Sequence, residues 1–245
     1  MSHESSERTV RLDRIERLLA GAYADGYVTR DDGETIPVYP TGTDEAQGRG
    51  IRQLIVAEQA VRTFEVGFAL GLSTLNIAAG LCEVGTPGAT HTTIDPTEAV
   101  AWGDAGRRLV EQAALDELVE IVVESSHSIL PRWCAEGRCD FDIAFIDGDH
   151  RFDPCFVDVF FAERLVRPGG LIILDDMWMP SVRMVAAFFE TNVNFELLTG
   201  AMPDAFAWNS RAPWRKVRTG KRNTAVFRKP TTFFQRPNEH FVPFW

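Results

Sequence analysis

The stretch FEVGFALGLSTLNIAAG, residues 64–80, places an acidic residue and two glycines between a strand and a helix. The run TFEVG is typical of a strand, and a helical pattern begins at about Ser73. In sheets built from strand-helix units, ligands bind beyond the carboxyl ends of the strands, usually at the first such turn. The turn that carries Gly67 and Gly71 is therefore the first candidate for a ligand site.

The rest of the chain repeats this strand-helix pattern. Four further runs, THTTID, VEIVVE, FDIAFID and GLIILDD, are each followed by a helical segment. Five such units in series predict a parallel sheet covered by helices. Two more strands, NFELLTG and NTAVFRK, are joined by a loop too irregular for a crossover helix, which favours an antiparallel last strand. The predicted fold class is α/β, with a doubly wound, mostly parallel sheet of seven strands.

The N-terminal part differs from this pattern. Apolar residues at helical spacing predict an amphipathic helix over about Thr9–Ala22. The polar stretch 24–48 has no lasting period and is expected to form a loop or lid, and a second helix is expected over about 50–60. We therefore expect residues 1–48 to form an N-terminal helix and lid, and residues 49–245 to form the α/β domain.

The composition narrows the class of protein. A chain of 245 residues with 45% hydrophobic content favours one domain with a buried core. No apolar run approaches the ~18 residues of a membrane span, and the charged N-terminus is unlike a signal peptide, so we expect a cytoplasmic protein without a membrane partner. The net charge of -10 argues against a nucleic-acid partner, although Arg211–Lys229 is strongly basic. The four cysteines lack CxxC spacing and indicate buried thiols.

The glycine turn lacks the marks of two common nucleotide sites. The dinucleotide fingerprint G-x-G-x-x-G requires a glycine where Ala69 stands, and no Gly-Lys-Ser/Thr follows as in a P-loop. A turn that follows Glu65 and is crowded by Phe68 and Leu70 suits a ligand with little negative charge. S-adenosylmethionine fits, because its sulfonium and amino groups are cationic. Alternatively, the glycines serve only a tight turn and close helix packing.

The ends of the next two strands carry further polar residues. Asp95 ends THTTIDP, where a carboxylate can accept both ribose hydroxyls of a nucleoside, although it could instead cap the next helix. The run ESSHSILP follows the third strand, and its Ser125, Ser126 and His127 could reach an adenine edge or act as helix caps. Together with the glycine turn, Asp95 favours a nucleoside ligand.

Four motifs in order, FEVGFALGLST, TTIDP, FDIAFIDGDH and LVRPGGLIILDD, resemble those of class I S-adenosylmethionine-dependent methyltransferases. They most resemble the O-methyltransferase branch that includes catechol and macrolide- or aminocoumarin-sugar O-methyltransferases. The resemblance covers about residues 47–198 and implies S-adenosylmethionine as cofactor and a small molecule as methyl acceptor. The cofactor-binding residues expected on this basis are Glu65, Gly67, Gly71, Ser73, Asp95, Ser126 and Asp147.

Four carboxylates are expected to converge where the fourth and fifth strands end, because these strands are neighbours in such a sheet: Asp147, Asp149, Asp175 and Asp176. Converging carboxylates repel one another unless they are protonated or neutralised, and a divalent cation is the usual remedy. Mg²⁺ prefers oxygen ligands and leaves room for a substrate with two vicinal oxygens. In the resembling metal-dependent enzymes the ligands correspond to Asp147, Asp175 and Asp176. Alternatively, these residues only cap a helix and support a loop.

The same comparison leaves two candidates for the general base. Catechol-type enzymes have a lysine three residues after the first metal aspartate, and this chain departs from them with His150. A histidine can act as a base near neutral pH without a shifted pKa, although this one could instead orient the loop. In the sugar methyltransferases the proposed base corresponds to Asp149. The sequence does not decide between the two.

Three functions remain after these comparisons, with methyl transfer to an oxygen of a small molecule favoured. A nicotinamide-dependent oxidoreductase is disfavoured by Ala69, and a non-catalytic nucleoside-binding protein by the intact acidic residues. The lid and the segment 201–220 are expected to close the acceptor pocket, with Trp178, Trp208 and Trp214 as walls for a sugar, polyketide or phenolic ring. These tryptophans could equally form core or a homodimer contact. The preference for arginine over lysine suggests a GC-rich bacterial source and a natural-product pathway.

Overall fold

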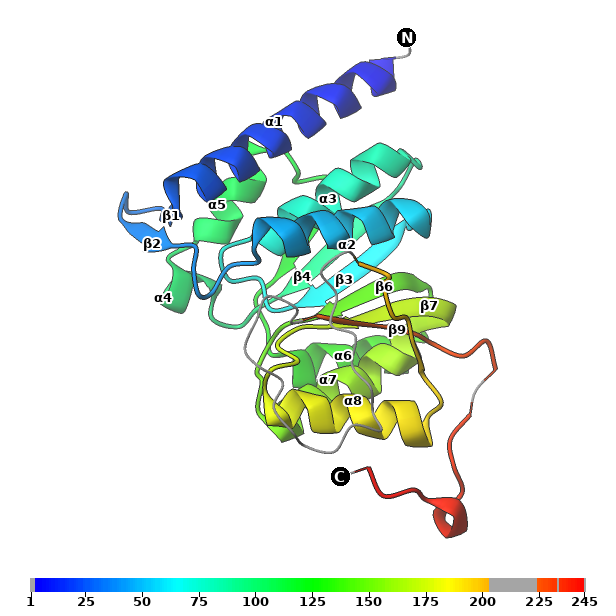
Figure 1. Cartoon of the computed structure of the whole chain (residues 1–245). Coiled ribbons are helices and arrows are strands. Elements are labelled where there is room, and N and C mark those ends of the chain that lie inside the picture. The colour runs from blue at the N-terminus through cyan, green and yellow to red at the C-terminus, as the bar shows by residue number, and fades with distance from the viewer. Residues whose placement is uncertain (1–2, 203–223, 233, 245) are drawn as a thin grey trace. The chain divides into compact units, whose positions relative to one another are not determined.

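The computed structural model describes residues 3–202, 224–232 and 234–244. They group into two compact units, Met1–Ser126 and His127–Trp245. The elements of the first unit are α1 (His3–Asp25), β1 (Tyr27–Thr29), β2 (Thr35–Pro37), α2 (Glu45–Ala57), β3 (Arg62–Val66), α3 (Leu72–Val84), β4 (Thr90–Ile94), α4 (Glu98–Trp102), α5 (Ala105–Gln112) and β5 (Val119–Val122) (Figure 1).

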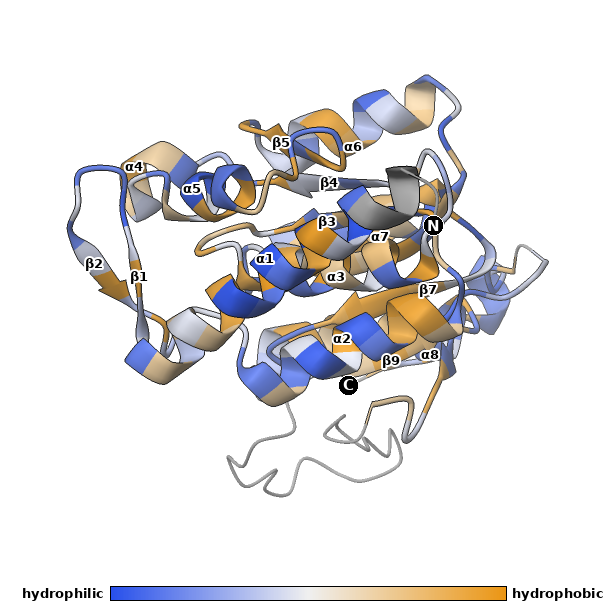
Figure 2. Cartoon of the chain, turned by 90° about the horizontal axis from the view of Figure 1, so that it is seen from above, coloured by the Kyte–Doolittle hydropathy of each residue, from blue (hydrophilic) through white to orange (hydrophobic). Residues whose placement is uncertain are grey.

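The strands β3, β4 and β5 of the first unit run parallel to one another. Glu65 of β3 lies opposite Thr93 of β4, which in turn lies opposite Ile121 of β5. Helix α3 packs against α2, and Figure 1 shows the two side by side. Gly80 permits this approach, because a Cβ there would lie 2.7 Å from the Cβ of Ile55. Figure 2 shows apolar and polar residues alternating along α2, as expected for a helix with one buried face.

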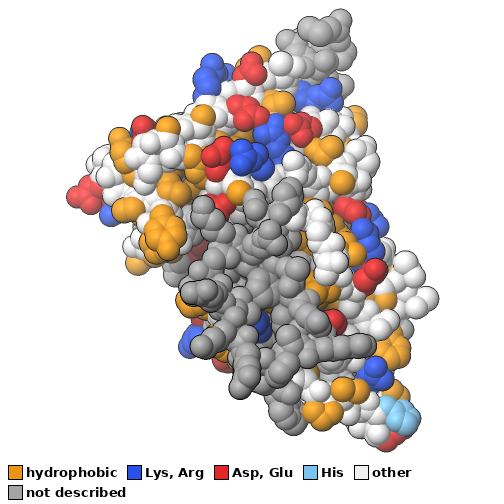
Figure 3. Space-filling model, viewed as in Figure 1, with side chains coloured by type: hydrophobic (Ala, Val, Ile, Leu, Met, Phe, Trp, Pro, Cys, Tyr) orange, Lys and Arg blue, Asp and Glu red, His pale blue; other side chains and the backbone are white. Residues whose placement is uncertain are grey.

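Helix α1 is fixed to the first unit by apolar contacts and by charge. Ile15 and Leu19 are buried. Arg52 of α2 pairs with Glu16 of α1 at 2.6 Å and with Glu83 of α3 at 2.5 Å. Charged side chains of both signs gather over α1 and α2 (Figure 3), but exposed ion pairs contribute little free energy, so apolar burial dominates. None of the described helices, α1 included, combines the length and apolar character needed to cross a membrane.

A short hairpin, β1 with β2, lies inside the segment 24–48 that the sequence predicts as a loop or lid. Val28 pairs with Ile36, and Gly33 makes the turn with a φ of 87°, a value that favours glycine. Each strand has three residues, too few to show the period of two by which strands are recognised. This is why the hairpin was not predicted.

Helix α2 begins earlier than the predicted start near residue 50. Asp44 caps it, since its Oδ1 accepts a hydrogen bond of 2.8 Å from the N–H of Gln47. The helix therefore crosses the predicted boundary between residues 48 and 49. The division into 1–48 and 49–245 stays a prediction.

The second unit repeats the strand-helix pattern and then changes direction. Strands β6 and β7 are parallel, with Ile146 opposite Leu174, and β9 runs antiparallel to both β7 and β8. Helix α7 packs on β6 and β7 with α8 beside it. The elements are α6 (Ser126–Ala135), β6 (Phe141–Ile146), α7 (Phe152–Leu165), β7 (Val166–Leu174), α8 (Pro180–Asn192), β8 (Glu196–Leu197), β9 (Ala225–Arg228) and the 3-10 helix η1 (Asn238–His240).

The described strands other than β1 and β2 are seven, in the order β5-β4-β3 within the first unit and β6-β7-β9-β8 within the second. All adjacent pairs described within the two units are parallel except those that involve β9. The predicted fold class, a mostly parallel α/β sheet with an antiparallel last strand and an N-terminal helical extension, is confirmed.

Candidate functional site

The glycine turn connects β3 to α3 in the first unit. Gly67 has a φ of 97°, Gly71 has a φ of 74°, and between them Ala69 adopts a φ of 45°, which is uncommon for a residue with a Cβ. A Cβ on Gly71 would lie 2.9 Å from the Cα of Gly106, at the start of α5. Gly71 is therefore required both by its backbone conformation and by close packing. Ser73 follows, buried in the first turn of α3.

Asp95 closes this turn from the end of β4. Its Oδ2 accepts hydrogen bonds from the backbone N–H groups of Phe68 (3.3 Å) and Ala69 (3.1 Å). Its Oδ1 accepts from the N–H (2.8 Å) and the hydroxyl (2.7 Å) of Thr97. A carboxylate has about four acceptor positions, so Asp95 uses its full capacity within the chain. A ribose would have to share or displace these bonds.

Glu65 is fully buried in β3 and is surrounded by other polar side chains. Its Oε1 accepts a hydrogen bond from Thr74 and lies 3.3 Å from Nε2 of His91. The other ring nitrogen of His91, Nδ1, is 2.9 Å from the hydroxyl of Thr63. The second carboxylate oxygen, Oε2, has no hydrogen-bond partner among the described residues. A buried acceptor without a partner is costly, so this oxygen is suited to a ligand donor.

The two residues of α6 that were predicted to contact adenine differ in their exposure. Ser126 begins α6 and is half-buried, while His127 beside it is exposed. Sequence reasoning missed His91, although a histidine inside the apolar pattern of a buried strand was visible in THTTI.

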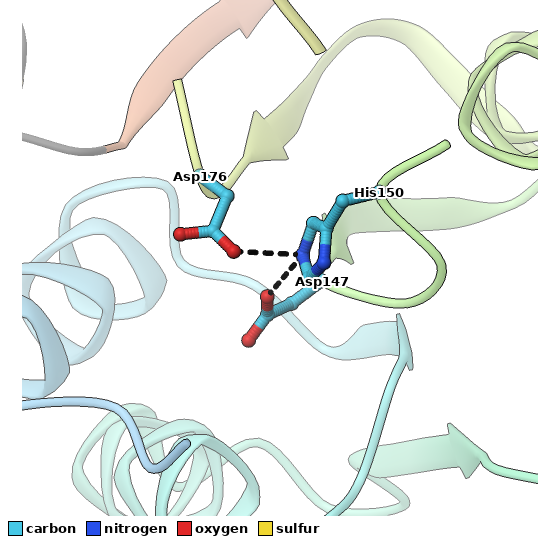
Figure 4. Close-up of side chains that lie close together, drawn as sticks. All are labelled: Asp147, His150 and Asp176. Carbon is cyan, nitrogen blue, oxygen red and sulfur yellow. Dashed lines mark hydrogen bonds and ion pairs between the residues drawn. The ribbon is translucent and has the colours of Figure 1, made fainter. Parts of the chain in front are cut away.

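The second unit brings three of the predicted residues together. Asp147 follows β6 and Asp176 lies two residues past β7, which is parallel to β6. His150 comes from the loop before α7, and its Nε2 lies 3.2 Å from Oδ1 of Asp147 and 3.0 Å from Oδ2 of Asp176. Figure 4 shows the imidazole pointing between the two carboxylates. These three donor atoms all lie within 4.8 Å of one another.

The ionisable groups of the cluster of Asp147, His150 and Asp176 have shifted pKa values. Burial raises the pKa of the Asp147 carboxyl well above its ordinary range, and the nearby negative charge of Asp175 adds to this rise. Burial acts to lower the pKa of His150, but its hydrogen bond to Asp147 and the surrounding carboxylates outweigh this effect and raise that pKa. The carboxylates thus favour a positive charge at the position of the imidazole.

Two neighbours hold the carboxylates after β7. Nε1 of Trp178, which is half exposed, donates a hydrogen bond of 2.7 Å to Oδ1 of Asp176. Asp176 itself has a φ of 53°, which places its side chain in a left-handed turn. Asp175 is buried, and its Oδ1 accepts from the hydroxyl of Thr224 at 3.2 Å. Asp175 therefore influences the cluster by its charge, while Asp176 contributes a donor atom.

Asp149 is placed differently from its neighbours. Its oxygens accept hydrogen bonds from Nε and Nη2 of Arg151, and this pairing lowers the pKa of the Asp149 carboxyl. The side chain is partly exposed. Residues 203–220, which include Trp208 and Trp214, and most of the basic stretch Arg211–Lys229 lie outside the described residues.

Comparisons with known proteins show what the chain resembles. Residues 64–177 match the model of a family described as a methyltransferase domain. The chain is 32% identical over 132 residues to a catechol O-methyltransferase of Mycobacterium tuberculosis (strain ATCC 25618 / H37Rv). It is 28% identical over 134 residues to a caffeoyl-CoA O-methyltransferase of Populus kitakamiensis. Each alignment covers 54% of both chains, so the protein spans about half the length of the curated relatives it matches.

Two solved structures share the fold over most of the chain. An O-methyltransferase from Bacillus cereus in complex with SAH superposes with a TM-score of 0.58 at 20% identity, covering 89% of this chain and 90% of that one. TomG, an O-methyltransferase from Streptomyces achromogenes in complex with SAM, gives a TM-score of 0.59 at 18% identity, covering 94% of this chain and 91% of that one.

The matched residues resemble a methyltransferase domain, and the shared fold is that of solved O-methyltransferases. The relatives and neighbours named above are all O-methyltransferases. The family resemblance of the four motifs is confirmed.

Proposed function

We propose that the protein is an S-adenosylmethionine-dependent O-methyltransferase that acts on a hydroxyl of a small molecule. The observation that carries this proposal is the cluster of Asp147, His150 and Asp176 at the strand ends of the matched methyltransferase domain. Ala69, which stands where the dinucleotide fingerprint has a glycine, disfavours a nicotinamide-dependent oxidoreductase, and the electrostatic cost of the cluster disfavours a binding protein without catalysis.

The first unit supports S-adenosylmethionine as the cofactor. The Oε2 of Glu65, which has no hydrogen-bond partner among the described residues, suits a cationic ligand with N–H donors, and Ala69 replaces the glycine that lets the backbone approach a pyrophosphate. When bound, S-adenosylmethionine supplies a methyl group on a sulfonium sulfur. The residues that we propose to hold it are Glu65, Gly67, Gly71, Ser73, Asp95, Ser126 and Asp147.

The second unit supports assistance by a divalent cation. Its donor set fits one, since the carboxylates of Asp147 and Asp176 converge with an imidazole between them. With Asp175, they form the oxygen set from which the sequence predicts Mg²⁺. A bound cation would stabilise the negative charge that an acceptor hydroxyl develops as it loses its proton. For that proton, His150 and Asp149 are both within the matched domain, and each remains a candidate base.

The acceptor is proposed at the level of chemical class. A hydroxyl beside a second oxygen, on a sugar, polyketide or phenolic ring, would use both the cation and the half-exposed indole of Trp178. TomG, which shares the fold, is described as involved in tomaymycin synthesis, and this supports a natural-product pathway. A cytoplasmic location and a possible homodimer stay predictions.

The test combines binding and turnover. Calorimetry with S-adenosylhomocysteine should show a saturable site, and incubation with S-adenosylmethionine and a panel of vicinal diols and catechols should release S-adenosylhomocysteine. A titration that follows NADH fluorescence serves as the comparison. Binding of NADH with no binding of S-adenosylhomocysteine would reject the methyltransferase in favour of an oxidoreductase.

A further inference from the structure

The position of His150 raises a question that the methyltransferase proposal leaves open. Its Nε2 lies between Oδ1 of Asp147 and Oδ2 of Asp176 (Figure 4). A residue in this position can serve either as the base or as a ligand of the cation. The distances distinguish these roles.

The spacing of the donor atoms is that of a metal site. Ligands at about 2.1 Å from one ion are separated by roughly 3.0–3.4 Å in octahedral or tetrahedral geometry. The nitrogen of His150 is 3.0 Å from the oxygen of Asp176 and 3.2 Å from that of Asp147. One ion could therefore contact the nitrogen and both oxygens with little movement of the side chains.

The surroundings of His150 hold it in this place. Its backbone carbonyl accepts a hydrogen bond of 2.6 Å from the hydroxyl of Ser181, in the first turn of α8. On the other side of the cluster, Trp178 binds Oδ1 of Asp176, which leaves Oδ2 directed at the imidazole. Partners of this kind orient the ligands in metal sites.

The identity of the donors decides which metal is preferred. Mg²⁺ selects oxygen ligands, whereas an imidazole nitrogen favours first-row transition ions such as Co²⁺ and Zn²⁺, and Mn²⁺ accepts both types of donor. We propose that His150 is a nitrogen ligand, and that with Asp147 and Asp176 it makes the site prefer a first-row transition dication over Mg²⁺. This inference rests on the cation assistance of the proposed function, and it leaves Asp149 as the other candidate for the base.

The experiment uses the full chain, freed of metal by a chelator and then titrated separately with Co²⁺, Mn²⁺ and Mg²⁺. Calorimetry should show Co²⁺ binding at least about 100-fold more tightly than Mg²⁺, because the nitrogen donor favours cobalt. Electron spin echo spectra of the Mn²⁺ form should show modulation by a directly bound nitrogen. In His150→Gln this modulation should vanish and the ratio of Co²⁺ to Mg²⁺ affinity should fall at least tenfold, while His240→Gln in η1 should keep both properties.

Absence of nitrogen modulation in the wild-type spectrum, or equal affinity for Co²⁺ and Mg²⁺, would overturn the inference. An unchanged affinity ratio in folded His150→Gln would do the same. If that variant does not fold, the wild-type spectrum decides by itself. Calorimetry with S-adenosylhomocysteine on the same protein distinguishes failure of this inference from failure of the proposed function. If S-adenosylhomocysteine binds but none of the metal ions does, only the ligand role of His150 is rejected. If S-adenosylhomocysteine does not bind either, the methyltransferase function itself is rejected.

Discussion

The carboxylates at the strand ends of the two units differ in their hydrogen bonding and in their charge environment. In the first unit, Asp95 accepts four hydrogen bonds from its own chain and so fixes the turn after β3. In the second unit, Asp147 and Asp176 converge on one imidazole, and burial raises the pKa of Asp147. The first arrangement is complete without a ligand. The second is electrostatically costly without a cation and is the better place to look for chemistry.

The largest effect should follow from neutralising the cluster. We expect Asp147→Asn to weaken metal binding below detection and to lower turnover on the order of 10³-fold, because charge stabilisation at the reacting oxygen is lost. Its unfolding free energy should change little, since one of several repelling carboxylates is removed. Asp153→Asn, which removes an exposed charge from the first turn of α7, is the control. Wild-type turnover in Asp147→Asn would contradict the catalytic role that we assign to the cluster of the second unit.

The base should be separable from the ligands within the second unit. We expect Asp149→Asn to reduce turnover by about 10²-fold, as for the loss of a general base, while leaving metal affinity and cofactor affinity unchanged. His150→Gln should instead weaken metal binding first. Titration of both variants with Co²⁺ measures their metal affinity, and turnover at saturating metal then measures the loss of the base separately. A normal rate in Asp149→Asn would return the base role to His150.

The sequence predicts the cluster only up to the strand ends. Asp147 and Asp176 were expected to meet because parallel neighbouring strands end at one edge, and the register of Ile146 with Leu174 confirms this. The approach of His150 to Asp176 could not be predicted, because it depends on a loop anchored by Ser181, far along the chain, and on the positive φ of Asp176. Long-range side-chain contacts of this kind leave no periodic signal.

The same limit applies in the first unit. The fold could be predicted because TFEVG and THTTID carry strand patterns and the glycines mark the turn between strand and helix. The full burial of Glu65 beside His91 could not be predicted, because it depends on which face of β3 is covered. The short strands β1 and β2 fall below the length at which a pattern is visible.

A smaller effect should separate the structural role of Asp95 from its ligand role. We expect Asp95→Asn to weaken binding of S-adenosylhomocysteine by roughly 10- to 100-fold, because a hydrogen bond to a charged acceptor contributes about 1.5–3 kcal/mol. Thr97→Ala removes one of the bonds to the same carboxylate and leaves the charge in place. It should reduce the unfolding free energy by about 1 kcal/mol with affinity preserved. Calorimetry and urea unfolding on both variants check this, and equal affinity in Asp95→Asn and wild type would leave Asp95 a structural residue only.

The smallest effect concerns Glu98, a second buried carboxylate of the first unit. Burial raises its pKa to about 7, the charges of Asp95 and Asp104 add to the rise, and the hydrogen bond from the N–H of Arg107 acts against it. Its Oε2 has no hydrogen-bond partner among the described residues. The folded protein therefore keeps this proton over a range of pH in which the unfolded chain, with an ordinary glutamate pKa, has lost it.

The sign of the pH dependence follows from this difference. Between the ordinary glutamate pKa of 4.5 and the folded value of about 7, the native state binds more protons than the unfolded state, so stability falls as the pH rises through this range. We expect Glu98→Gln, which can still accept from Arg107, to unfold like wild type at pH 5 and to be more stable than wild type by about 1–3 kcal/mol at pH 8. Urea unfolding at the two pH values measures this, with Glu111→Gln on the exposed side of α5 as the control. An equal gain at both pH values would show that Glu98 is charged throughout this range and would contradict the raised pKa of its carboxyl.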